Sequence, residues 1–207
     1  MNIEMIKRHL TFLGIITSLL LLIVSTLYYP GGSQAAQHSV GYNWQNNYLC
    51  NLFNEKAMNG LDNAARPLAI AGMFLLCISF AIFFIRFSKK IPSATSAKVI
   101  KYAGAGAMVF AFLVITPYHD LMTTAASILA LLAIVYISVY LFQSELFFLK
   151  VWSIACVVVI GFNNYVYYSK HLLDLLPIMQ KVGFVFITIW ILGVEYFTKA
   201  EDFQVAK

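Results

Sequence analysis

The chain has 207 residues, of which 61% are hydrophobic and 11% are charged, and its mean hydropathy is +0.79. A soluble domain of this length cannot bury so much apolar surface, so the composition excludes a water-soluble globular protein and predicts an integral membrane protein. The net charge of +5 does not indicate a nucleic-acid partner, because no basic patch is interleaved with aromatic residues.

Six apolar runs are each long enough to cross about 30 Å of hydrocarbon as an α-helix. The first is longer than the apolar part of a signal peptide, about 7 to 15 residues, so we expect an uncleaved first helix. The runs lack the short alternating pattern of a membrane β-barrel. The predicted fold is all-α, a single domain (1–207) built as a bundle of six transmembrane helices at about residues 10–29, 67–87, 99–116, 118–142, 147–168 and 178–198.

The distribution of Lys and Arg predicts the orientation of the bundle. One side would carry ten of these residues: Lys7, Arg8, Arg86, Lys89, Lys90, Lys98, Lys101, Lys150, Lys199 and Lys207. The other side would carry four: Lys56, Arg66, Lys170 and Lys181. Both termini are therefore expected in the cytoplasm of a bacterial inner-membrane protein, with the loop between the first two helices outside.

That outer loop, residues 30–66, is too long to lack internal structure. Within it, residues 44–55 read WQNNYLCNLFNE, which at helical spacing separates an aromatic face containing Trp44 from an amide face. The amide face carries Asn47, Asn51 and Glu55. The pattern predicts an amphipathic helix lying at the outer membrane surface, with its amides directed to water or to the other helices.

A polar stripe is predicted along the outer half of the fifth helix. Asn163, Tyr167, His171 and Asp174 recur at spacings of four, four and three, and Lys170 flanks them. Polar side chains are costly in lipid, so this face should turn into the bundle. Together with the outer loop it predicts a polar pocket that opens outward.

Cys50 is the one cysteine expected outside the helices, so no outer disulfide is predicted. It is interpreted either as a half-buried structural residue or as a nucleophile activated by a nearby His. Cys77 and Cys156 would lie in helices 2 and 5 as small apolar residues.

His119 and Asp120 follow a predicted break between helices 3 and 4, at TPYHD, and His171 lies at the same outer level. These residues, with His38 as a further candidate ligand, could bind zinc, but no HxxxH or HExxH spacing places two His on one helical face. Hydrogen bonding at helix ends is the favoured interpretation, with no metal and no cofactor. Glu195 is expected to snorkel or to pair with a basic residue.

Several segments resemble a bacterial six-helix membrane family catalogued as domain of unknown function number 998. They are YPGGS (29–33), the Asn-rich outer segment, NGLDNAARPLAIAGMFLL (59–76) and TPYHD (116–120). The layout is also distantly similar to the FRAG/DRAM type of membrane protein. The resemblance covers most of the chain and implies the six-helix fold without implying a reaction. Members of the family commonly carry a Ser-containing segment where this chain has YLCNL (48–52).

Two classes of function remain, with a small transporter as a third. In the first, the protein binds a membrane lipid, a small molecule or a partner membrane protein, or forms a homo-oligomer. In the second, it is a membrane-embedded hydrolase of a lipid or envelope substrate that uses His119, Asp120 and His171, with Cys50 as a further candidate. The predicted ligand-binding residues are Trp44, Asn47, Asn51, Glu55, Asn163, Tyr167, Lys170 and His171.

Overall fold

The predicted six-helix bundle is confirmed in the computed structural model of the protein, which describes residues 3–204. Each of the six helices has a segment long and apolar enough to cross a membrane, which fits a multi-pass membrane protein. The main shifts from prediction are at the starts of the first and third helices, which begin several residues earlier. The helices are α1 (Ile3–Leu27), α2 (Arg66–Phe87), α3 (Ala94–Leu113), α4 (His119–Gln143), α5 (Phe147–Ser169) and α6 (Leu176–Phe197).

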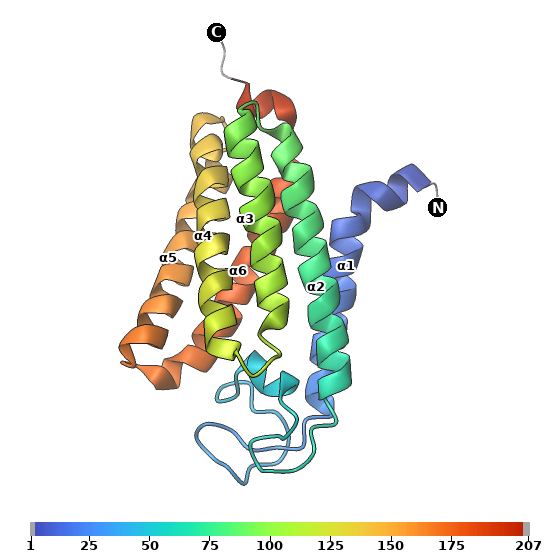
Figure 1. Ribbon diagram of the computed structural model, residues 1–207, viewed down its shortest axis with the longest axis vertical. Coiled ribbons are helices and arrows are strands. Elements are labelled where there is room, and N and C mark those ends of the chain that lie inside the picture. Colours follow the sequence, from blue (N-terminus) through green and yellow to red (C-terminus); the bar gives the residue numbers. More distant parts are fainter. Residues whose placement is uncertain (1–2, 205–207) are drawn as a thin grey trace.

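Helices that follow one another in the chain pack side by side, and α6 also contacts α2 (Figure 1). The first turns of α1 lean away from the bundle (Figure 1). Phe83, Phe84 and Trp190 are fully or almost fully buried in the main apolar core. Gly104 lets α3 approach α2 closely, because a Cβ at that position would overlap the Phe84 ring. A small residue at this position therefore lets the two helices pack closely.

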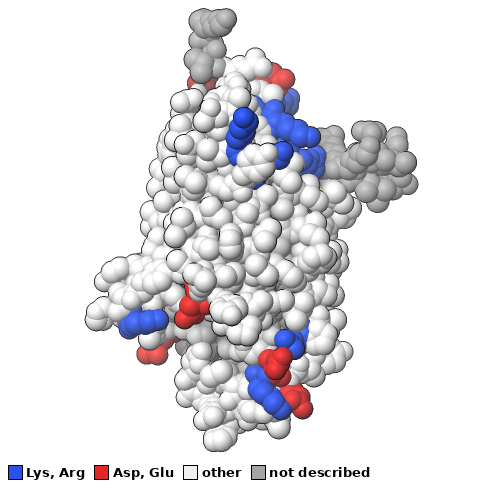
Figure 2. All heavy atoms as spheres, viewed as in Figure 1, with Lys and Arg blue, Asp and Glu red and all other residues white. Residues whose placement is uncertain are grey.

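The two ends of the bundle differ in what covers them. We call the end that carries residues 28–65 the loop end, and the end that carries the α2–α3 connection and residues 198–204 the terminal end. On the face shown in Figure 2, charged side chains lie toward the two ends and leave an uncharged band between them. Such a band is what a chain spanning hydrocarbon requires.

Glu195 pairs with a basic residue at the terminal end, as expected. Its Oε1 lies 3.0 Å from a guanidinium nitrogen of Arg86, and its side chain is 5% exposed. Lys90 donates to the carbonyl oxygens of Glu195 and Thr198 at 3.2 and 2.9 Å. These contacts tie the end of α2 to the end of α6.

The surface helix predicted for residues 44–55 is present only as the short 3-10 helix η1 (Leu49–Phe53), after a turn at residues 44–46. The Asn side chains explain this correction. Oδ1 of Asn51 accepts a hydrogen bond from the backbone N–H of Tyr48 at 2.8 Å, and Oδ1 of Asn47 accepts from that of Asn43 at 2.9 Å. Amide side chains that bind local backbone groups offer the chain an alternative to a continuous helix.

The predicted polar stripe on the fifth helix is shortened, because α5 ends at Ser169. Lys170 and Leu172 both adopt a left-handed backbone conformation with φ of 60°. Left-handed residues cannot continue a right-handed helix. The prediction that His171 and Asp174 share one helical face with Asn163 and Tyr167 is therefore wrong.

Candidate functional site

The buried amides at the loop end hold the loop together. Asn63 donates through Nδ2 to the carbonyl oxygens of Asn51, Leu52 and Asn54, at 3.1, 3.2 and 2.9 Å. Its Oδ1 accepts from the N–H of Ala65 at 3.2 Å, just before α2 begins. Asn63 thus fastens η1 to the start of α2.

Two predicted ligand-binding residues, Asn47 and Asn51, are likewise buried and engaged within the loop. Nδ2 of Asn47 donates to Gly32 O at 2.8 Å and to Oδ1 of Asn51 at 3.3 Å. Burial raises the pKa of the Tyr42 phenol, which donates to the carbonyl oxygen of Asn47 at 3.3 Å. The contacts of these residues account for the shape of the loop and leave little capacity for a ligand.

The first turns of α6 anchor the loop to the bundle through Gln180 and Lys181, which are not among the predicted site residues. The Leu49 N–H donates to Oε1 of Gln180 at 2.8 Å, and Nζ of Lys181 donates to Asn47 O at 2.6 Å. The sequence signal that could have identified them is the polar Gln-Lys pair at the start of the last apolar run. The sequence shows no partner for this pair.

His119 and Asp120 form the centre of a hydrogen-bonded group at the start of α4. Nδ1 of His119 lies 3.0 Å from Oδ1 of Asp120. The same carboxylate oxygen accepts a hydrogen bond of 2.6 Å from the Tyr167 hydroxyl on α5. Lys170 lies over the Tyr167 ring, with Nζ 4.6 Å from the ring centroid. Of the predicted site residues, His119, Asp120, Tyr167 and Lys170 thus come together.

Cys50 on η1 is held by a residue of α6, because its Sγ accepts a hydrogen bond from Nε2 of Gln180 at 3.3 Å. Nε2 of His119 is buried without a hydrogen-bond partner among the described residues. The described contacts therefore join the free thiol to Gln180 and the imidazole to Asp120.

Other predicted site residues lie apart from this group. Trp44 is exposed and packs edge-on against Tyr42, and Glu55 pairs with Arg66 at 3.4 Å. His171 is exposed, and its backbone N–H bonds to Ser169 Oγ at 3.3 Å. Asn163 donates to Met179 O at 3.0 Å and so links α5 to α6. Within the part of the chain that the structure describes, no three His, Cys, Asp or Glu side chains are grouped as metal ligands.

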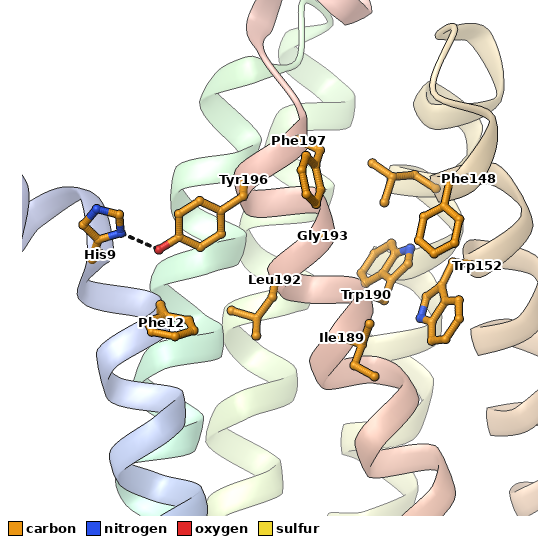
Figure 3. A pocket seen from close by; sticks show the side chains of 11 residues that line it. His9, Phe12, Phe148, Trp152, Ile189, Trp190, Leu192, Gly193, Tyr196 and Phe197 are labelled. Atoms are coloured by element: carbon orange, nitrogen blue, oxygen red, sulfur yellow. Dashed lines mark hydrogen bonds between the residues drawn. The ribbon is translucent and has the colours of Figure 1, made fainter.

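A second candidate site is an apolar cavity of about 490 Å³ at the terminal half of the bundle (Figure 3). Side chains from α1, α5 and α6 line it. At its rim, Nδ1 of His9 lies 2.7 Å from the Tyr196 hydroxyl, and the two rings are stacked. The lining residues are His9, Phe12, Phe148, Leu149, Trp152, Ile189, Trp190, Leu192, Gly193, Tyr196 and Phe197.

Aromatic rings give this cavity rigid walls. Trp152 stacks between Phe148 and Phe186, with centroid distances of 5.7 and 5.0 Å. Its indole N–H donates to Phe186 O at 3.1 Å, and the Trp190 N–H donates to Ser153 Oγ at 2.7 Å. Both indole donors are therefore satisfied within the bundle, and the cavity presents mainly apolar surface.

Comparisons with protein-family models, with curated proteins and with solved structures found no match. The class of the protein therefore follows from its fold and its two sites alone. It is a six-helix membrane protein with a polar site at one end and an apolar cavity at the other. The resemblance to the family of unknown function stays a prediction.

Proposed function

We propose that the protein binds a phospholipid and that an acyl chain of this lipid occupies the apolar cavity between α1, α5 and α6. The observation that supports this proposal is the cavity itself, which opens between membrane-spanning helices and is lined almost entirely by apolar side chains. Its volume is in the range of small-molecule sites, about 300 to 1,000 Å³. In a bilayer, the molecules that reach such an opening are lipids.

The charges of the terminal end favour an anionic headgroup. Lys150 directly follows the cavity residue Leu149 in the chain. Lys199 lies two positions after the cavity residue Phe197. Basic side chains near the membrane surface attract anionic lipids by about 1 kcal/mol each. His9 and Tyr196 supply polar atoms at the rim, between the apolar walls and the basic end. The excess of Lys and Arg also supports a cytoplasmic terminal end, which would make this an inner-leaflet site.

This proposal keeps the lipid-binding function predicted from the sequence and moves the site. The outward-facing pocket was expected to use Asn47 and Asn51, but their hydrogen bonds are formed within the loop. The terminal cavity has no comparable network of polar side chains within it.

Binding can be measured by native mass spectrometry of the detergent-purified protein during titration with phosphatidylglycerol or phosphatidylcholine. We expect one retained lipid and tighter binding of phosphatidylglycerol. Ile189→Phe would fill part of the cavity and displace one or two methylene groups, at about 0.8 kcal/mol each, which weakens binding by about 4- to 15-fold.

The matched control is Ile128→Phe, the same substitution at an exposed position on α4 away from the cavity. It should bind lipid as the unaltered protein does. Equal loss of lipid in both variants, or no loss in either, would contradict a binding site at the cavity.

A further inference from the structure

A basic surface covers the terminal ends of α2 and α3, and none of its residues lines the cavity between α1, α5 and α6. Figure 2 shows Lys and Arg side chains gathered over these two helix ends. The basic residues of this part of the chain are Arg86, Lys89, Lys90, Lys98 and Lys101. The sequence contains no Asp or Glu between Asp62 and Asp120, so neither helix carries an acidic residue that would balance them.

Two of these five side chains serve the bundle itself. A guanidinium nitrogen of Arg86 lies 3.0 Å from the carboxylate of Glu195, which is buried. Lys90 donates to the carbonyl oxygens of Glu195 and Thr198 at 3.2 and 2.9 Å. The charges of Arg86 and Lys90 are therefore engaged at the end of α6.

The other three lysines carry charge that the described residues do not neutralise. Lys89 and Lys98 are exposed, and Lys101 lies over the Tyr102 ring with Nζ 5.1 Å from the ring centroid. None of the three forms an ion pair with a described residue. The ammonium groups of Lys89 and Lys98 are therefore open to an anion from outside the protein.

On α3, exposed apolar surface continues from the lysines along one side of the helix. Tyr102 lies four residues after Lys98 and is 66% exposed, and Val109 lies seven residues further on and is 60% exposed. Residues at these spacings share one side of an α-helix. This side of α3 therefore has an ammonium group at its terminal end and apolar surface along the rest of its length.

Helix α2 presents the same arrangement beside it. Ile85 and Phe74 are exposed and lie about three helical turns apart, on one side of the helix. Lys89 follows two residues after the end of α2. The two exposed sides border one seam, because the Phe74 ring packs edge-on against the Phe112 ring of α3 with 5.4 Å between the centroids. An apolar chain lying along this seam would have its polar end at the lysines.

We propose that the seam between α2 and α3 binds an anionic phospholipid, with the headgroup phosphate on Lys89 and Lys98 and an acyl chain along the seam. The lysines border the uncharged band of the bundle, where lipid headgroups lie, and the exposed Tyr102 ring is typical of that boundary. Each lysine at a membrane surface strengthens the binding of an anionic lipid by about fivefold. The pair therefore favours an anionic over a zwitterionic lipid by about 25-fold.

The test uses the purified full chain in lipid nanodiscs that contain equal amounts of phosphatidylglycerol and phosphatidylcholine. A bilayer is needed because the seam is an open surface on which detergent would replace a lipid. The photoreactive amino acid benzoylphenylalanine replaces Tyr102, and mass spectrometry identifies the lipid attached to it after irradiation. We expect phosphatidylglycerol to exceed phosphatidylcholine by about 25-fold. Lys89→Gln combined with Lys98→Gln should bring the two lipids to nearly equal amounts.

A matched control places benzoylphenylalanine at Val135 of α4, which is exposed and lies eight residues from the terminal end of its helix, as Tyr102 does. No Lys or Arg occurs between Lys101 and Lys150, so both lipids should attach equally at position 135, with or without the two substitutions. Ile189→Phe should leave the ratio at position 102 unchanged, so the cavity proposal and this one can fail separately. Equal attachment of the two lipids at position 102, or a ratio there that survives loss of both lysines, would overturn the proposal.

Discussion

At the scale of single residues, one buried amide does much to shape the loop. Asn63 bridges three carbonyl oxygens of η1 and its surroundings and one N–H at the start of α2. No other residue type combines two N–H donors and an acceptor on so short a side chain. Removing this amide leaves several backbone groups unsatisfied, and each buried unsatisfied group costs about 1 to 3 kcal/mol.

Asn63→Ala should therefore open the loop without unfolding the bundle. We expect a local destabilisation of about 2 to 3 kcal/mol, which corresponds to an increase of about 30- to 150-fold in the open population. The rate of trypsin cleavage after Lys56 under native conditions reports this population. Asn54→Ala, an exposed amide of the same segment, is the control and should be cleaved as slowly as the unaltered protein.

At the scale of elements, the helices were predictable and the loop was not. Long apolar runs predict spanning helices because the hydrocarbon allows few alternatives. The pattern in residues 44–55 predicted a helix because the spacing of residues indicates which side chains would share a helical face. It does not indicate which groups the amide side chains bind. Asn47 and Asn51 bond to the nearby backbone and limit the helix to η1. Asp120 and Tyr167 were recognised as candidates, but their contact depends on packing between α4 and α5.

Two glycines in α3 provide a test of packing between elements. A Cβ at Gly104 would overlap the Phe84 ring, whereas a Cβ at Gly106 would meet Leu129 at an ordinary 3.5 Å. Gly104→Ala should therefore lower the free energy of unfolding by about 1 to 3 kcal/mol, and Gly106→Ala should leave it unchanged or raise it. Unfolding of both variants in mixed micelles with increasing sodium dodecyl sulfate measures the difference. Equal effects would show that the α2–α3 contact tolerates added volume.

At the scale of the whole molecule, the loop covers one end of the bundle, and the lipid cavity lies in the other half. If the Lys and Arg distribution sets the orientation, the loop faces outward and the lipid cavity faces the inner leaflet.

Labelling of single cysteines in a Cys50→Ser background tests this orientation. Glu55→Cys at the loop end should react with a membrane-impermeant maleimide in intact cells, because its side chain is 80% exposed. Lys89→Cys at the terminal end, also exposed, should react only after permeabilisation. The reverse pattern would place the loop in the cytoplasm and assign the cavity to the other leaflet.

The attachment of the loop to α6 means that the loop cannot complete its contacts until the last helix has been synthesised. Leu49 and its partner Gln180 are separated by 131 residues, so the ribosome adds the partner long after the loop has been made. At about 5 to 20 residues per second, the delay is about 7 to 26 seconds. Throughout this interval the Cys50 thiol lacks its hydrogen bond from Gln180. A chain that stopped after Ser169 would lack the contacts of its loop with α6, however well its first five helices had entered the membrane.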